Sequence, residues 1–143
     1  MAKTWTAIVL AAGRGLNDPM AKAYGVSHKC ALPVNGVPML RRVINALQKS
    51  QSIAAIAISI ESPAIVHEAL AENESGIAVI ASENSAPLSA FVAIRKNPAF
   101  PVLITTGDHA LLTPEMVDYF CEHAGRNGAD FSAGLARAEV ILK

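Results

Sequence analysis

Apolar residues follow two alternating patterns along the chain. Short continuous apolar runs, typical of parallel strands buried on both faces, alternate with segments whose apolar residues recur at helical spacing. The alternation predicts an α/β fold, a three-layer sandwich with a mostly parallel sheet. The predicted strands cover residues 6–11, 53–60, 77–81, 102–105 and 129–135. The predicted helices cover residues 39–49, 62–70, 85–96 and 113 to 125 or 128.

The same patterns predict where the helices begin and which side they bury. Ser62 before Pro63 and Thr113 before Pro114 combine a capping residue with a proline in the first turn. The third predicted helix is expected to bury Leu88, Phe91 and Ile94. The last is expected to bury Met116, Val117, Phe120 and Cys121.

Composition narrows the class of function. The chain has 143 residues, of which 52% are apolar and 17% charged, and its 12 Lys and Arg balance its 12 Asp and Glu. With no net charge there is no electrostatic footprint for nucleic acid or an anionic membrane. The sequence shows neither a secretion signal nor a bilayer-spanning apolar run, so we expect a cytoplasmic protein. Cys30 and Cys121 are expected to be buried, reduced thiols.

A glycine-rich turn follows the first predicted strand. Gly13 and Gly15 come after the small residues Ala11 and Ala12, so backbone N–H groups there could approach a phosphate without a clash. The alternative is a tight turn that binds nothing. Neither a dinucleotide fingerprint, which would need glycine at Asp18, nor a P-loop is present. Right-handed crossovers would place this turn on the same sheet edge as the loops after residues 81 and 105.

Three stretches together resemble a known signature. They are "LAAGRG" at 10–15, "HKCALPVNGVPML" at 28–40 and "TTGDHALLTPEM" at 105–116. Their order and spacing resemble the MobA-like nucleotidyltransferases, which are related to the sugar-phosphate and molybdenum-cofactor nucleotidyltransferases. The resemblance covers essentially the whole chain and implies a Rossmann-like, GT-A-like fold of the nucleotide-diphospho-sugar transferases.

The resemblance also implies a reaction and a set of site residues. A nucleoside triphosphate, GTP or CTP being favoured, would transfer its NMP to a phosphorylated cofactor or sugar acceptor and release pyrophosphate. Lys29 would act on the phosphates, and Asp108 would bind Mg²⁺ or Mn²⁺. The nucleotide would be held by Leu10, Ala11, Ala12, Gly13, Gly15, Asn17 and Ser85. A capping role at the start of the third predicted helix explains Ser85 equally well.

The sequence departs from the family pattern beside the glycine turn. Asn17 stands where relatives carry an arginine, and His28 replaces the usual proline before the lysine. Arg14 could substitute for the missing arginine, or it could simply face solvent. Asn17 therefore keeps open a second interpretation, a catalytically weakened nucleotide-binding domain. A glycosyltransferase is disfavoured because "GDH" is not a DxD motif.

Length limits the prediction further. We expect one domain over residues 1–143. Domains of the family continue well beyond a fifth strand, so we expect the nucleotide-binding part without the acceptor-binding part. Apolar surface left uncovered could then favour a homo-oligomer.

Overall fold

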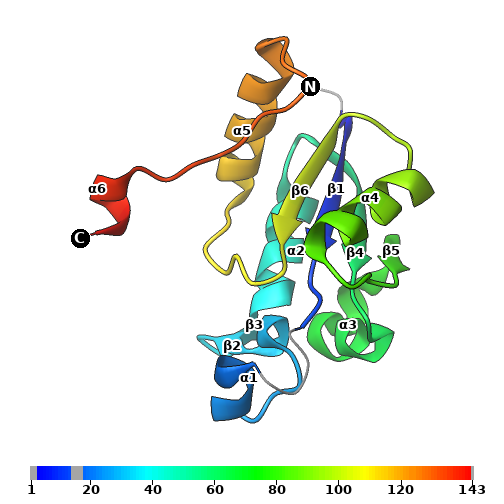
Figure 1. The fold of residues 1–143 in the computed structure, drawn as a ribbon, viewed down its shortest axis with the longest axis vertical. Helices are drawn as coiled ribbons and strands as arrows, with labels where there is room; N and C mark the ends of the chain where they lie inside the picture. The colour runs from blue at the N-terminus through cyan, green and yellow to red at the C-terminus, as the bar shows by residue number, and fades with distance from the viewer. Residues whose placement is uncertain (1–2, 14–17, 143) are drawn as a thin grey trace.

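The computed structural model describes residues 3–13 and 18–142 (Figure 1). Its centre is a parallel four-stranded sheet in the order β5-β4-β1-β6. The strands are β1 (Trp5–Leu10), β4 (Ile53–Ser59), β5 (Ile77–Ile80) and β6 (Val102–Thr106). Four of the five predicted strands are thus confirmed, with ends that differ by at most one residue from the prediction.

Helices cover both faces of the sheet, which confirms the three-layer architecture (Figure 1). One face packs on α2 (Met39–Lys49), α3 (Pro63–Leu70) and α5 (Pro114–Arg126). The other packs on α4 (Ala86–Lys96). Short elements complete the fold: α1 (Pro19–Ala23), η2 (Lys29–Ala31), the hairpin of β2 (Pro33–Val34) and β3 (Val37–Pro38), η3 (Ala71–Glu74) and α6 (Ala138–Ile141).

The central position of β1 explains its apolar sequence. It is hydrogen-bonded to β4 on one side and β6 on the other, and Ile8 pairs with Ala57 and Ile104. Ala7, Ile8 and Val9 are fully buried because both faces of the strand lie under helices. The strand therefore holds its carboxyl end, which leads into Ala11, between two neighbouring strands.

Helix starts largely follow the predicted capping chemistry. The Ser85 hydroxyl accepts a hydrogen bond from the Leu88 N–H at 3.4 Å. That of Thr113 accepts one from the Met116 N–H at 3.3 Å. Ser62 precedes Pro63 at the start of α3, but its side chain makes no capping bond, so the predicted side-chain cap is wrong there.

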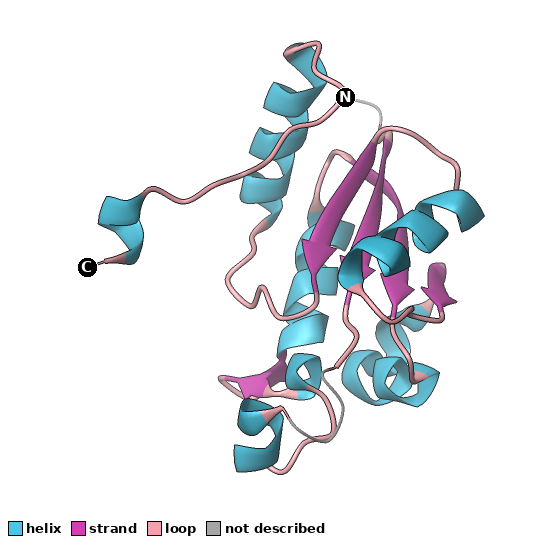
Figure 2. Cartoon of the chain, in the orientation of Figure 1, coloured by secondary structure: helices cyan, strands magenta, loops and turns pink. Residues whose placement is uncertain are grey.

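The predicted strand over 129–135 is wrong. This segment lacks strand pairing and leads as a loop from α5 toward α6, away from the sheet (Figure 2). Phe131 is 83% exposed and Leu135 is 89% exposed. A strand needs a neighbour for its backbone hydrogen bonds, and within the described residues the sheet ends at β6.

Two predicted helix faces need correction. In α4, Leu88 and Phe91 are exposed, whereas Ser89 and Ala93 are buried. Small residues let the helix lie close to the sheet, and the longer apolar side chains then point outward. In α5, the buried positions are Val117 and Cys121 as predicted, but Met116 is 48% exposed.

Two further expectations concern membrane-spanning segments and the state of the cysteines. No helix within 3–13 and 18–142 has the length and apolar character to cross a bilayer. Cys30 and Cys121 are buried free thiols, as predicted.

Candidate active site at the carboxyl edge of the sheet

The ends of β1 and β6 meet at the edge where the sequence places its chemistry. The Gly107 N–H donates to the Leu10 carbonyl oxygen at 2.9 Å. A Cβ atom at Gly107 would lie 2.9 Å from the Cβ of Ala11 and 3.3 Å from the Cβ of Cys30. Only glycine leaves room for this approach. The end of β1 and the loop that carries Asp108 are therefore neighbours.

An ion pair joins the two charged residues predicted for the site. Lys29 lies in η2 and Asp108 follows β6, and Lys29 Nζ is 2.7 Å from Asp108 Oδ2. Their side chains are 40% and 34% exposed, respectively, so both can be reached from solvent. The structure thus brings together residues 79 positions apart in the chain.

The lysine keeps the Asp108 carboxylate ionised. Burial alone would raise the pKa of Asp108, but hydrogen bonds from Lys29 and Thr106 and the lysine charge outweigh it. The net effect lowers this pKa below its ordinary value. At neutral pH the site therefore presents one carboxylate and one ammonium group side by side.

Cys30 packs beneath this edge without being reactive. Its Sγ lies 3.6 Å from the Ala11 carbonyl oxygen, and the residue is buried. Burial, followed by the negative charges of Glu61 and Asp108, raises its pKa to about 12. A thiol with this pKa stays protonated and is a poor nucleophile.

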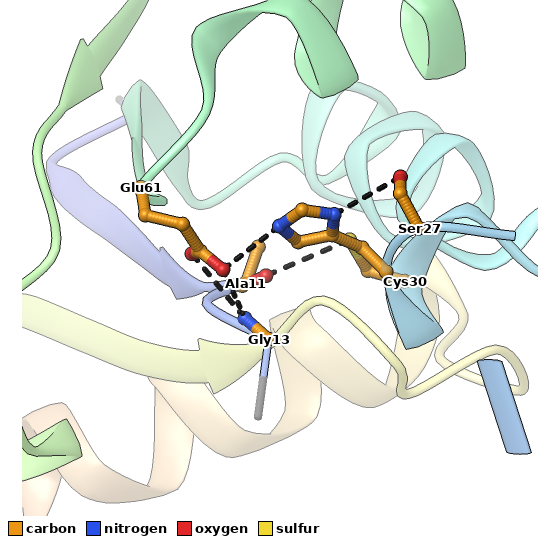
Figure 3. A network of polar contacts seen from close by, with 6 residues as sticks. Ala11, Gly13, Ser27, Cys30 and Glu61 are labelled. Atoms are coloured by element: carbon orange, nitrogen blue, oxygen red, sulfur yellow. Dashed lines mark hydrogen bonds and ion pairs between the residues drawn. The ribbon is translucent and has the colours of Figure 1, made fainter. Parts of the chain in front are cut away.

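Glu61, which belongs to none of the sequence motifs, lies beside Gly13 (Figure 3). The Gly13 N–H donates to its carboxylate, at 3.0 Å to Oε1 and 3.3 Å to Oε2. His28 Nε2 lies 2.8 Å from Oε1, and His28 Nδ1 lies 3.1 Å from Ser27 Oγ. Glu61 lies shortly after the end of β4. Polar residues that follow parallel strands share one edge of the sheet, so its position in the sequence could have indicated a place in the site.

The hydrogen bonds also keep Glu61 ionised. Burial acts to raise its pKa, but bonds from its own N–H, from Gly13 and from His28 together lower the pKa below its ordinary value. The ionised Glu61 carboxylate therefore accepts the hydrogen bond of the Gly13 N–H, a donor that the sequence predicts for a phosphate.

The other predicted nucleotide-binding residues are only partly placed by the structure. Leu10, Ala11, Ala12 and Gly13 lie at the end of β1 and just after it. Ser85 caps α4, and nothing in its contacts indicates a ligand. The predictions for Arg14, Gly15 and Asn17 lie outside the described residues.

Among the described residues, Asp108 is the candidate ligand for a metal that would arrive with phosphate. Within residues 3–13 and 18–142 there is no group of three or more His, Cys, Asp or Glu that could hold an ion. Asp108 offers one ionised carboxylate at an accessible edge. Mg²⁺ is commonly bound by one or two carboxylates together with substrate phosphates and water, and this set matches that chemistry.

The chain is similar to known proteins in sequence and in fold. The family model for the MobA-like NTP transferase domain matches residues 7–140. A nucleotidyl transferase from Methanothermobacter thermautotroptrophicus has 25% sequence identity and a TM-score of 0.64, with 84% of this chain and 57% of that chain covered. No curated protein matches the chain in sequence.

Two further solved structures share the fold. One is a CMP:2-keto-3-deoxy-manno-octonic acid synthetase complexed with CTP, at 15% identity and a TM-score of 0.64, covering 90% of this chain and 49% of that one. The other is a Mycobacterium tuberculosis protein in complex with manganese, at 21% identity and a TM-score of 0.64, covering 85% and 60%. The chain thus spans about half to three fifths of the length of these three neighbours.

Proposed function

The chain belongs to the MobA-like NTP transferase domain family, and on that premise we propose that it is the nucleotide-binding part of a metal-dependent nucleotidyltransferase. The reaction would move an NMP from a nucleoside triphosphate to a phosphorylated acceptor. The observation that carries the proposal is the 2.7 Å ion pair of Lys29 and Asp108 beside the glycine turn. Together they offer a cation for phosphate and a carboxylate for a metal at one solvent-accessible edge.

Each member of the pair would exchange its partner when nucleotide binds. Lys29 would turn from Asp108 to the triphosphate and neutralise part of its charge. Asp108 would hold Mg²⁺ that arrives on the phosphates, and this ion would supply further charge neutralisation. The exposure of both side chains supports an exchange, because neither is held by the surrounding core.

The reaction itself requires little covalent chemistry from the protein. A phosphate oxygen of the acceptor would bond to the α-phosphorus. The bond from that phosphorus to the oxygen bridging to the β-phosphate would break, and pyrophosphate would leave with the electron pair. Catalysis then depends on holding the attacking and leaving oxygens in line while neutralising charge. Backbone groups from Leu10 to Gly13 would position the nucleotide.

We propose CTP or GTP as the nucleotide. One structure with the same fold contains CTP and another contains manganese, which supports a pyrimidine triphosphate and a divalent ion as the first ligands to examine. The acceptor would be a phosphorylated cofactor or sugar.

A catalytically weakened nucleotide-binding domain is the second candidate, favoured by one observation. Asn17 replaces the arginine of relatives, and an amide offers hydrogen bonds without charge. Such a domain would bind nucleotide without depending on Asp108 and its metal.

Calorimetric titration of CTP and GTP, with Mg²⁺ or with EDTA, tests the proposal. We expect Mg²⁺-dependent binding that Asp108→Ala weakens about 10- to 100-fold, since one charged contact contributes about 1.5 to 3 kcal/mol. Asp130→Ala removes an exposed carboxylate elsewhere and serves as the matched control. Equal affinity in EDTA, unchanged by Asp108→Ala, would favour the weakened domain, and no binding of either nucleotide would contradict both candidates.

A further inference from the structure

We propose that the His28 imidazole is a binding group for the nucleotide's triphosphate, and that the Glu61 carboxylate holds the place of a phosphate oxygen until the nucleotide displaces it. The inference rests on the proposed function and extends it to two residues that the family pattern does not include. The observation behind it is that two donors, Gly13 N–H and His28 Nε2, meet on one oxygen of Glu61 (Figure 3).

The donors are well defined whatever the charge of the imidazole. An ionised carboxylate only accepts hydrogen bonds, so the contact at 2.8 Å requires a hydrogen atom on His28 Nε2. Nδ1 then either accepts from the Ser27 hydroxyl or donates to it at 3.1 Å. The Nε2–H donor is therefore present in both the neutral and the protonated ring.

The three groups differ in how firmly they are held. The His28 side chain is only 13% exposed, and Gly13 belongs to the backbone that leaves β1. The Glu61 side chain is 40% exposed. The imidazole is thus more buried than the carboxylate, and the Glu61 side chain has room to turn into solvent. Such an arrangement suits the replacement of this acceptor by an incoming one.

A phosphate oxygen matches the acceptor that it would replace. It carries negative charge and takes N–H donors at the same distances as a carboxylate oxygen. Space at the turn is limited, since a Cβ at Gly13 would lie 3.1 Å from both Glu61 Oε1 and His28 Cδ2. A triphosphate and the Glu61 carboxylate would also repel each other at this range. Exchange is therefore favoured over binding side by side.

The position of His28 agrees with the departures of this sequence. The signature that this sequence resembles has proline before the lysine and arginine after the second glycine, and this chain has His28 and Asn17 instead. Proline has no side-chain donor, whereas His28 supplies one directly beside Lys29.

Calorimetry on the full chain with CTP and with inorganic pyrophosphate, both with Mg²⁺, tests the proposal. Glu61→Gln removes the competing charge, and we expect affinity for both ligands to rise about fivefold. We expect His28→Ala to lower both affinities about tenfold. His28→Gln should restore most of the loss because its amide nitrogen is again a donor. Glu68→Gln, on the exposed side of α3, is the matched control and should change neither affinity.

The outcomes separate this inference from the proposed function. If Lys29→Ala and Asp108→Ala weaken CTP binding while His28→Ala does not, the inference is wrong and the proposed function stands. If Glu61→Gln lowers affinity for both ligands, Glu61 supports the turn rather than competing for it, and the inference is again wrong. Pyrophosphate binding that depends on His28 and Glu61, without any binding of CTP or GTP, would indicate a phosphate site that takes no nucleotide, and would contradict both the proposed function and the assignment of His28 to a triphosphate.

A direct measurement guards against variants that fold poorly. In wild-type protein, ¹H–¹⁵N spectra follow the Gly13 amide and the His28 ring nitrogens as pyrophosphate is added. We expect both to shift together as the carboxylate is exchanged for phosphate. Shifts confined to Lys29 would overturn the proposal.

Discussion

The two ends of the sheet each carry carboxylates, but their partners differ in kind. At the amino end of β4, Asp118 of α5 accepts hydrogen bonds from Ser50 Oγ at 2.5 Å, from Ser52 N at 3.0 Å and from Gln51 N at 3.2 Å. At the carboxyl end, Asp108 forms an ion pair with Lys29. Glu61 contacts the His28 side chain and accepts a hydrogen bond from one backbone N–H, that of Gly13.

This difference separates a structural role from one in binding. Backbone donors of the loop between α2 and β4 cannot leave Asp118 without unfolding the loop, and the Ser50 side chain is fully buried. Asp108 and Glu61 instead contact the side chains of Lys29 and His28 at an accessible edge, and a ligand could replace either carboxylate in these contacts. We therefore expect carboxylates at the amino end to govern stability and those at the carboxyl end to govern ligand affinity.

The largest expected effect on stability comes from Asp118→Ala. The change would leave the buried Ser50 hydroxyl and the Gln51 N–H without this acceptor, while the Ser52 N–H would keep Ser50 Oγ at 3.0 Å. We expect the free energy of unfolding to fall by about 2 kcal/mol, the range for unsatisfied buried polar groups. Urea denaturation measures this, with Asp130→Ala as the control. A loss of CTP affinity at unchanged stability would reverse the assignment of the two ends.

How far the sequence predicts the fold depends on how local the cause is. The strands of the sheet and the starts of α4 and α5 follow from apolar runs, capping residues and prolines, all of which act within a few residues. The predicted strand over 129–135 fails because pairing requires a neighbouring strand, which no local pattern reveals. The prediction of the buried face of α4 fails for a similar reason. The small residues Ser89 and Ala93 face the sheet, and this orientation depends on tertiary packing rather than on the local pattern.

The candidate site likewise contains residues that local motifs predict and one that they do not. Lys29 and Asp108 could be proposed from motifs, and the structure places them in contact, although their roles stay predictions. Glu61 is a glutamate after a strand with no distinctive neighbours in sequence. Its importance depends on meeting His28 and Gly13, which lie 33 and 48 positions away. Only the parallel order of β4 beside β1 brings them together.

A smaller effect is expected from pH. Burial opposes ionisation of Asp118, but hydrogen bonds from Ser50, Gln51 and Ser52 outweigh it, so its folded pKa is below the unfolded value. A lowered carboxyl pKa stabilises the fold above the unfolded pKa of about 4, and this contribution is lost as pH falls through the folded pKa. We expect thermal stability to drop below about pH 4, with a shallower drop in Asp118→Ala. An equal slope in both proteins would contradict this.

Lys29→Met is expected to have the smallest effect on stability and a large effect on nucleotide binding. Lys29→Met removes the charge from a pair whose members are 40% and 34% exposed. Exposed ion pairs contribute little because water screens them, so we expect the free energy of unfolding to change by less than about 0.5 kcal/mol. CTP affinity should fall about tenfold or more, since a charged contact to phosphate is lost. Lys96→Met, an exposed lysine in α4, is the matched control for both measurements. Destabilisation by more than about 2 kcal/mol with unchanged affinity would mean that the Lys29–Asp108 pair supports the fold, as Asp118 does.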